Sequence, residues 1–145
     1  MTGGRLTQIE PIGYVKTSFA DLSGTPSQAS ENTQATGTVV LRTDLVDALL
    51  GLERYPFLWL ITLLHQGGEE PAPLQCVPRA KEAKGQMQGV FASRSPRRPN
   101  SIGLSLVRQL QLLDNTITFA GVDLVDGTPV LDIKPWFADC DTPAT

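Results

Sequence analysis

The stretch SIGLSLVRQLQLL, residues 101–113, alternates between two kinds of side chain. Large apolar residues share one face of an extended chain: Ile102, Leu104, Leu106 and Leu110. Smaller or more polar residues share the other face: Gly103, Ser105, Val107 and Gln109. Because a period of two belongs to extended chain and not to a helix, this segment predicts a β-strand.

Further strands are predicted at residues 9–17, 37–42, 57–65, 116–125 and 131–136. The most apolar of these segments, FLWLITLLH at 57–65, predicts a central strand. Many short strands agree with 13 glycines and 11 prolines, which favour turns. Since strands outnumber helices and no βαβ rhythm is present, we expect a mainly β fold. The expected architecture is an antiparallel β-barrel or curled sheet with one or two short helices.

One helix is predicted at residues 43–55, where the period changes. Its apolar positions fall on one helical face: Leu45, Ala48, Leu49 and Leu52. Thr43 is a suitable N-cap and Gly51 a suitable end. The polar segment 20–36 and the segment 66–75 are predicted loops. The length of 145 residues fits a single domain, 1–145.

The net charge of the chain is −3, but its cations are concentrated between residues 79 and 108. Seven cations there are opposed only by Glu82, a local charge of +6: Arg79, Lys81, Lys84, Arg94, Arg97, Arg98 and Arg108. The overall charge argues against non-specific binding of nucleic acid, whereas the separated charge can steer an anionic partner to one face. A solvated basic loop is the alternative interpretation.

Several classes of site are excluded by what the chain lacks. His65 is its only histidine, which excludes sites built on several histidines and ordinary zinc sites. Cys76 and Cys140 have no metal-binding spacing and are expected to be reduced thiols. Glycine motifs for nucleotides and the Gly-x-Ser-x-Gly elbow are missing. The N-terminus lacks the apolar core of a secretory signal, and no apolar run is long enough to span a membrane.

Three polar segments lie at the ends of predicted strands. In SRSPRRPN, residues 93–100, two prolines stiffen a loop of arginines, which suit bidentate capture of carboxylate or phosphate. His65 closes the most apolar strand, and both a structural role and a site role stay open for it. In DLVDGTP, residues 123–129, the Asp126-Gly127 pair favours a simple hairpin turn. Its carboxylate and exposed amides could equally hold ribose hydroxyls or an amino group.

The order of several motifs resembles one family. IGYVKTSF, TPSQ, GLE, LWLITLLHQ, VFASRSPRRPNSIGLSLVRQL and DLVDGTPVLDIKPW occur in the order of the TsaA/YaeB family, also called TrmO. The resemblance covers roughly residues 9–136. It implies a β-barrel that binds S-adenosylmethionine without a Rossmann fold and works as a cytoplasmic homodimer. The implied reaction is methylation of the N6 atom of a threonylcarbamoyl-adenosine next to the tRNA anticodon.

The resemblance also implies which residues contact the cofactor. They carry over onto Pro26, Ser27, Gln28, His65, Gln66, Arg94, Leu104, Leu124, Val125, Asp126 and Gly127. As a hypothesis, Asp126 is catalytic, because a carboxylate can orient the weakly nucleophilic adenine amine and receive its positive charge. Arg94 is assigned to the cofactor side. Four cations are assigned to RNA phosphates: Lys81, Lys84, Arg97 and Arg98.

Three positions depart from the family pattern. Ser27 stands where the family has arginine, Ser101 where it has a second proline, and Trp136 where it has tyrosine. We also expect no additional C-terminal domain of the kind some tRNA-modifying members carry. Ser27 and the expected lack of that domain bear on the RNA substrate more than on the cofactor. Two alternatives are therefore kept: a module that binds S-adenosylmethionine for sensing or regulation, and a methyltransferase with another acceptor.

Overall fold

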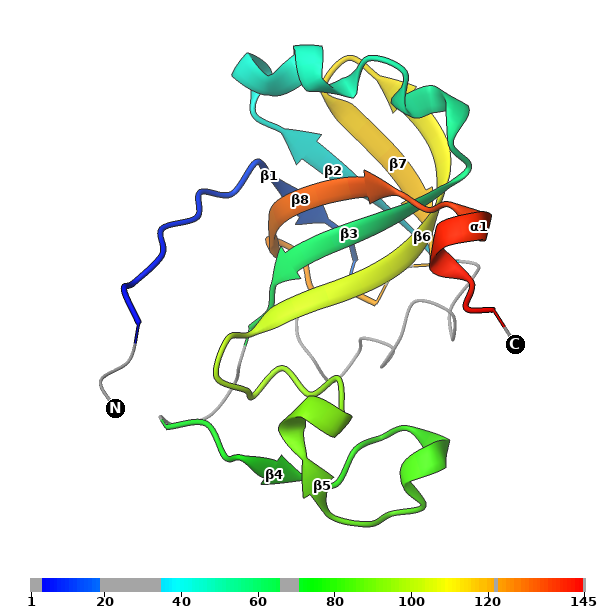
Figure 1. Cartoon of the computed structure of the whole chain (residues 1–145). Coiled ribbons are helices and arrows are strands. Elements are labelled where there is room, and N and C mark those ends of the chain that lie inside the picture. Colours follow the sequence, from blue (N-terminus) through cyan, green and yellow to red (C-terminus); the bar gives the residue numbers. More distant parts are fainter. Residues whose placement is uncertain (1–3, 19–34, 66–70, 122, 145) are drawn as a thin grey trace.

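Strands β1, β2, β7, β6, β3 and β8, in that order, close into an antiparallel barrel in the computed structural model (Figure 1). Their bounds are Gly13–Lys16, Thr36–Leu41, Thr116–Ala120, Ile102–Leu113, Phe57–Leu63 and Pro129–Pro135. The structure describes residues 4–18, 35–65, 71–121 and 123–144. The antiparallel barrel predicted from the sequence is confirmed, and every predicted strand is present with shifted ends. Most of the predicted loop 20–36 lies outside the described residues.

The segment 43–55 is not the predicted single helix. It forms two 3-10 helices, η3 (Thr43–Leu49) and η4 (Leu52–Arg54). Gly51 separates them with φ 88°, a left-handed conformation that favours glycine. The cap position belongs to Arg42 and not to Thr43, and no side chain caps the helix.

Asp44, next to that cap, is held in an ion pair with the guanidinium of Arg42. Nη2 of Arg42 lies 2.7 Å from Oδ2 of Asp44, and Nε lies 3.1 Å from Oδ1. This pairing lowers the pKa of the Asp44 carboxyl below its ordinary value. The carboxylate therefore binds a neighbouring side chain and does not cap the first turn.

The barrel is filled by alternate residues of its strands. The core side chains that are at most 2% exposed include Val15, Val39, Leu58, Leu60, Val107, Ile117, Phe119 and Val130. On β6 the smaller face points inward: Gly103, Ser105 and Val107 are buried. A Cβ on Gly103 would lie 2.6 Å from Cδ2 of Leu64 and 2.7 Å from Oγ1 of Thr62, so this part of the interior has no room for a larger residue.

The larger apolar face of β6 consequently points outward. Ile102, Leu104 and Leu106 are 46%, 49% and 37% exposed. They pair across the ladder with Leu63, Ile61 and Trp59 of β3. We call these six residues the outer apolar face. The closed sheet therefore carries large apolar side chains on its outer surface as well as in its interior.

The alternating strand directions divide the connections between two ends of the barrel. Residues 17–35, 64–101 and 121–128 all connect strands at one end, which we call the loop end. Residues 42–56 and 114–115 connect strands at the opposite end. This division decides which polar residues can meet.

The connection 64–101 contains a small unit that the sequence reasoning missed. Strands β4 (Gln75–Cys76) and β5 (Gln88–Gly89) pair with each other, flanked by the 3-10 helices η5 (Lys81–Ala83) and η6 (Val90–Ala92). Figure 1 shows this β4–β5 unit standing apart from the barrel beyond its loop end. Two-residue strands carry too little alternation to be predicted from sequence.

The remaining helix, α1 (Ala138–Asp141), follows β8 and lies against β3. Asp141 Oδ2 accepts a hydrogen bond from Nε1 of Trp59 at 3.1 Å. Cys76 and Cys140 are both free thiols, as predicted. Acidic neighbours Asp139 and Asp141 raise the pKa of the Cys140 thiol. Within the described ranges, no helix has the length and apolarity needed to cross a membrane.

Close approach of β1 and β2 gives a stability prediction at Gly13. A methyl group there would meet the carbonyl oxygen of Val40 and lie 2.9 Å from Cα of Leu41, both backbone atoms that cannot rotate away. We expect Gly13→Ala to lower the free energy of unfolding by about 1–3 kcal/mol in urea denaturation.

Gly89→Ala is the matched control. Its new methyl group would have only the oxygen of Leu74 nearby, at 3.9 Å, and its φ of −63° suits alanine. The change should stay within about 0.5 kcal/mol. Equal urea midpoints for the two variants would contradict this account of the β1–β2 contact.

Candidate functional site

The barrel topology brings the predicted cofactor segments to one end. His65 follows β3, Arg94 precedes β6, and residues 124–127 connect β7 to β8, all at the loop end. The predicted residues Pro26, Ser27, Gln28 and Gln66 lie outside the described residues. The connections that contain them, residues 17–35 and 64–101, both start at the loop end. The described members of the predicted set, His65, Arg94 and residues 124–127, therefore lie at the same end of the barrel although they are far apart in sequence.

The turn at residues 121–128 is fixed to β1 by several hydrogen bonds. The backbone N–H of Thr17 donates to Oδ1 of Asp126 at 3.0 Å, and the Thr17 hydroxyl donates to the carbonyl of Leu124 at 3.1 Å. The N–H of Gly127 donates to the carbonyl of Val15 at 2.8 Å. Gly127 has φ 85°, as a tight turn requires. Asp126 is exposed at the surface, so one of its oxygens organises the turn while the carboxylate faces outward.

Below this turn the interior of the barrel becomes polar. The buried polar residues are Thr62, Ser101, Ser105 and Thr128, at 0%, 3%, 4% and 7% exposure. Ser105 donates from Oγ to Oδ1 of Asp123 at 2.8 Å. The hydroxyl oxygens of Thr62 and Ser101 are buried without a hydrogen-bond partner. We call these four residues and Asp123 the polar mouth.

Sequence reasoning missed the polar mouth. The indication was available in the alternation of 101–113, where Gly103 and Ser105 lie on one face. That pattern did not say which face points inward. Polar groups inside a barrel are costly unless they are hydrogen-bonded, and the four buried polar residues of the described chain all lie toward this end. At the opposite end, Oε1 of Gln109 is also buried without a partner.

The arginine loop is organised by one of its own guanidinium groups. Nη1 of Arg98 donates to the carbonyl of Ser93 at 2.8 Å and to that of Ser95 at 3.3 Å. The guanidinium carbon of Arg98 also lies 5.9 Å from the ring centroid of Phe91. Arg94 is exposed and Arg97 half-buried. Arg98 therefore has a structural role in the loop that the assignment to RNA phosphates did not anticipate.

Four other predicted residues have their side chains elsewhere: on the outer surface, in the core or on the β4–β5 unit. Leu104 belongs to the outer apolar face and points away from the interior. Leu124 is 3% exposed and its side chain is part of the hydrophobic core, so only its backbone is open to other contacts. Lys81 and Lys84 are exposed on the β4–β5 unit. Among the described residues, no group of three or more His, Cys, Asp or Glu side chains could hold a metal ion.

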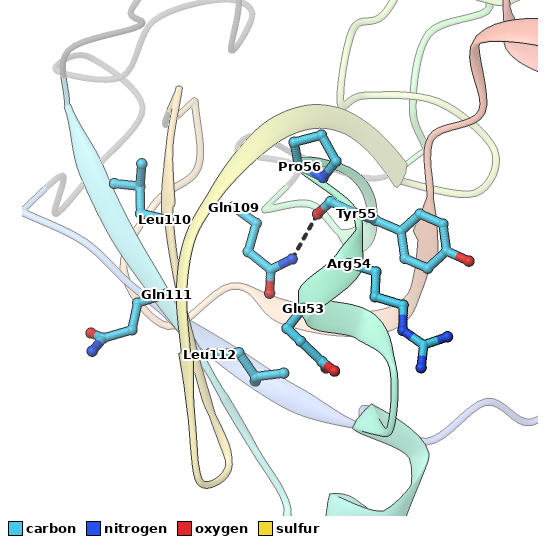
Figure 2. Close-up of a pocket in the computed structure, with 8 residues that line it drawn as sticks. All are labelled: Glu53, Arg54, Tyr55, Pro56, Gln109, Leu110, Gln111 and Leu112. Atoms are coloured by element: carbon cyan, nitrogen blue, oxygen red, sulfur yellow. Dashed lines mark hydrogen bonds between the residues drawn. The ribbon is translucent and has the colours of Figure 1, made fainter.

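A shallow depression of about 320 Å³ lies at the opposite end of the barrel, between η4 and β6 (Figure 2). Gln109 spans it, donating from Nε2 to the carbonyls of Leu52 at 2.9 Å and Tyr55 at 2.7 Å. None of the predicted site residues lines it. The amide of Gln109 fastens η4 to the barrel next to a register shift in β6, which is a structural task.

Comparison with known proteins agrees with this geometry. A family model described as the tRNA-methyltransferase O N-terminal domain matches residues 14–142. A Rattus norvegicus protein named "tRNA (adenine(37)-N6)-methyltransferase" is 37% identical over 98% of this chain, which covers 33% of that protein. A Methanothermobacter thermautotrophicus protein named "Probable S-adenosyl-L-methionine-binding protein" is 35% identical over 93% of this chain and 93% of its own length. The solved structure "Crystal structure of TrmO from Pseudomonas aeruginosa" matches with a TM-score of 0.77 and 37% identity, over 97% of this chain and 60% of that one.

The fold and the loop end define a small antiparallel barrel whose connections form a candidate ligand site at one rim. The chain belongs to the tRNA-methyltransferase O N-terminal domain family. It spans about a third of the length of the first mammalian relatives that it matches. The resemblance to the TrmO family stated from the sequence is thus confirmed.

The bond between Ser105 and Asp123 gives the second prediction. Ser105→Ala removes a donor to a carboxylate in a part-buried position, so we expect the free energy of unfolding to fall by about 1.5–3 kcal/mol. Urea denaturation followed by circular dichroism measures the change. Ser18→Ala, at an exposed position at the start of a loop-end connection, is the control and should change it by less than about 0.5 kcal/mol. Equal stability of the two variants would contradict a structural role for this bond.

Proposed function

We propose that this chain is an S-adenosylmethionine-dependent methyltransferase domain that acts on the N6 atom of threonylcarbamoyl-adenosine next to the tRNA anticodon. One observation carries the proposal: the three connections that hold the family's cofactor motifs all leave the same end of the barrel. The names of the relatives support the choice of tRNA as substrate. A tRNA substrate implies work in the cytoplasm, the compartment predicted from the sequence.

The residues present at the loop end fit the chemistry of S-adenosylmethionine. The carboxylates of Asp123 and Asp126 suit its cationic sulfonium and amino groups, and the exposed guanidinium of Arg94 suits its carboxylate. Buried hydroxyls of Thr62 and Ser101 lack partners in the polar mouth, where a polar ligand or water would satisfy them. S-adenosylmethionine, when bound, supplies an activated methyl group.

The protein's own contribution is alignment, charge and exclusion of water. Asp126 is tied through Oδ1 to the Thr17 N–H, which fixes the direction of its carboxylate. We assign Oδ2 to the adenine N6–H, where it orients the amine and offsets the positive charge that develops on nitrogen. Arg94 binds the cofactor side of the site, while Lys81, Lys84 and Arg97 meet RNA phosphates. Arg98 keeps the arginine loop in shape and adds to the positive field.

A second candidate function is a module that binds S-adenosylmethionine without methylating RNA. The archaeal relative named as a probable S-adenosyl-L-methionine-binding protein favours it, because this chain matches nearly the whole of that protein. Transfer of tritiated methyl groups to bulk tRNA separates the two. Nuclease digestion of the product and mass spectrometry then identify the modified nucleoside and separate the proposed substrate from another acceptor.

Homodimer formation is also part of the proposal, and the outer apolar face supports it. Three cross-strand pairs of β3 and β6 carry its side chains, and four of these residues are more than a third exposed: Leu63, Ile102, Leu104 and Leu106. A contiguous apolar surface of this kind is typical of a protein interface. A second copy of the same chain is the partner that we assign to it.

The catalytic assignment gives the third prediction, tested with two changes at Asp126. Asp126→Asn keeps an oxygen that can accept the Thr17 N–H but removes the charge, so methyl transfer should fall by about a hundredfold or more. Calorimetric titration with S-adenosylmethionine should show a smaller loss of binding than the loss of methyl transfer, because Asp123 still supplies a carboxylate to the cationic groups of the cofactor. Asp126→Ala should lose the turn bond as well and be less stable by about 1 kcal/mol.

Arg94→Ala is the companion variant, and it should weaken the binding of S-adenosylmethionine in the same titration. Wild-type cofactor binding and turnover by Asp126→Asn would mean that Asp126 has no catalytic role. A wild-type protein that binds the cofactor yet transfers no methyl group to tRNA would favour the second candidate function.

The proposed interface gives the fourth prediction. Ile102→Glu puts a charge at a 46% exposed position of the outer apolar face, and sedimentation should detect one chain where the wild type gives two. Leu50→Glu, at a 95% exposed position between η3 and η4, is the matched control and should leave the mass unchanged. A wild type that sediments as a single chain would refute the homodimer.

A further inference from the structure

The β4–β5 unit combines exposed apolar side chains with positive charge. Phe91, Leu74, Met87 and Val77 are 81%, 72%, 63% and 52% exposed. The cations Arg79, Lys81 and Lys84 lie in the same unit, where the single acidic residue is Glu82. Isolated exposed hydrophobic residues are ordinary, but four in one short unit that stands apart from the barrel indicate an interaction surface.

Phe91 is held outward by a rigid backbone. Its neighbour Val90 is 2% exposed, and the Val90 N–H donates to the carbonyl of Leu74 at 2.9 Å. The Val90 carbonyl accepts the Ser93 hydroxyl at 2.8 Å and the Ser93 N–H at 3.2 Å. These bonds turn Val90 in and Phe91 out. Because the chain around the ring is already ordered, a ligand on the ring would cost little conformational entropy.

Arg98 supplies a second planar group beside the ring. Its guanidinium carbon lies 5.9 Å from the Phe91 centroid, and its Nη1 is fixed by the carbonyls of Ser93 and Ser95. Aromatic rings and guanidinium planes are the two kinds of side chain on which unpaired RNA bases stack. Phe91 and Arg98 together form what we call the stacking pair.

The positive charge of the β4–β5 unit favours RNA over a protein as its partner. An apolar protein partner would not need the three cations that the β4–β5 unit carries besides the ring, whereas single-stranded RNA offers unstacked bases and a line of phosphates. Between Phe91 and Arg98 in the chain is Arg94, in the loop that leads from η6 into β6. A nucleotide stacked there would be next to the loop end of the barrel.

We propose that Phe91, backed by Arg98, is a stacking platform for an unpaired base of the RNA substrate, a base of the tRNA anticodon loop. The inference rests on the proposed function for the identity of that RNA. It adds Phe91, which is not among the residues assigned to the cofactor or to RNA phosphates, and a contact that charge alone does not provide. The cations of the unit hold phosphates, and the ring holds a base.

The test measures binding of a synthetic tRNA anticodon stem–loop to the full chain by fluorescence anisotropy at several salt concentrations. Phe91→Ala should raise the dissociation constant about 5- to 150-fold, the range for loss of one stacked base. Phe91→Leu should bind the RNA as weakly as Phe91→Ala, because leucine keeps apolar area but has no π face. Phe91→Trp should bind as well as the wild type or better.

The salt dependence separates stacking from charge. Phe91→Ala should leave the slope of log affinity against log salt unchanged, whereas Lys81→Ala and Lys84→Ala should each reduce it by roughly 0.7. Leu50→Ala, an exposed apolar position at the opposite end, should change neither quantity.

Three outcomes would overturn the platform: wild-type RNA affinity in Phe91→Ala, wild-type affinity in Phe91→Leu, or a change of sedimenting mass in Phe91→Ala. The last would assign the ring to a contact between copies of the chain. Cofactor titration and methyl transfer by the wild type are measured alongside. If the wild type methylates and binds RNA and Phe91→Ala does so equally well, the platform fails and the proposed function stands. If the wild type binds no RNA, both the platform and the proposed function fail.

Discussion

The hydrogen bonds between β1 and β8 close the barrel, and the ladder between these two strands is short. Only Gly13 pairs with Val130 and Tyr14 with Pro129, and proline has no N–H to donate. The seam is extended by bonds just outside the ladder, from Ile12 to Val130 and from Val15 to Thr128. The turn that contains Asp126 continues the same seam, since Gly127 bonds to Val15. Closure of the sheet and placement of the candidate site therefore depend on one line of contacts.

Much of this arrangement could be predicted from the sequence, because alternation along a strand is a local property. Residues 101–113 and 57–65 gave strands close to those observed, and Asp126-Gly127 gave the turn. Inward and outward faces could not be assigned locally. Which side of β6 is buried depends on the space left by Thr62 of β3 and by Leu64, which follows that strand. The helix predicted at 43–55 failed for a related reason, since Asp44 is engaged by Arg42 and no side chain caps the segment.

The candidate site was predicted in part for the same physical reason. A histidine, an arginine loop and an Asp-Gly turn each lie next to a strand end, and strand ends of a closed antiparallel sheet gather at two rims. The polar mouth was not predicted, because Ser105 and Asp123 meet only after the barrel closes. The role of Arg98 was not predicted either. Its cation suggested a phosphate, whereas the carbonyls of Ser93 and Ser95, which its Nη1 contacts, belong to its own loop.

Thr17 occupies a special position in this molecule. It follows β1, begins the connection from β1 to β2, and bonds to the turn at residues 121–128 with both its amide and its hydroxyl. Two segments separated by a hundred residues are thereby anchored at one threonine. The start of the β1–β2 connection and the turn between β7 and β8 are therefore held at a fixed separation, so loss of the Thr17 hydroxyl would disturb both sides of the rim at once.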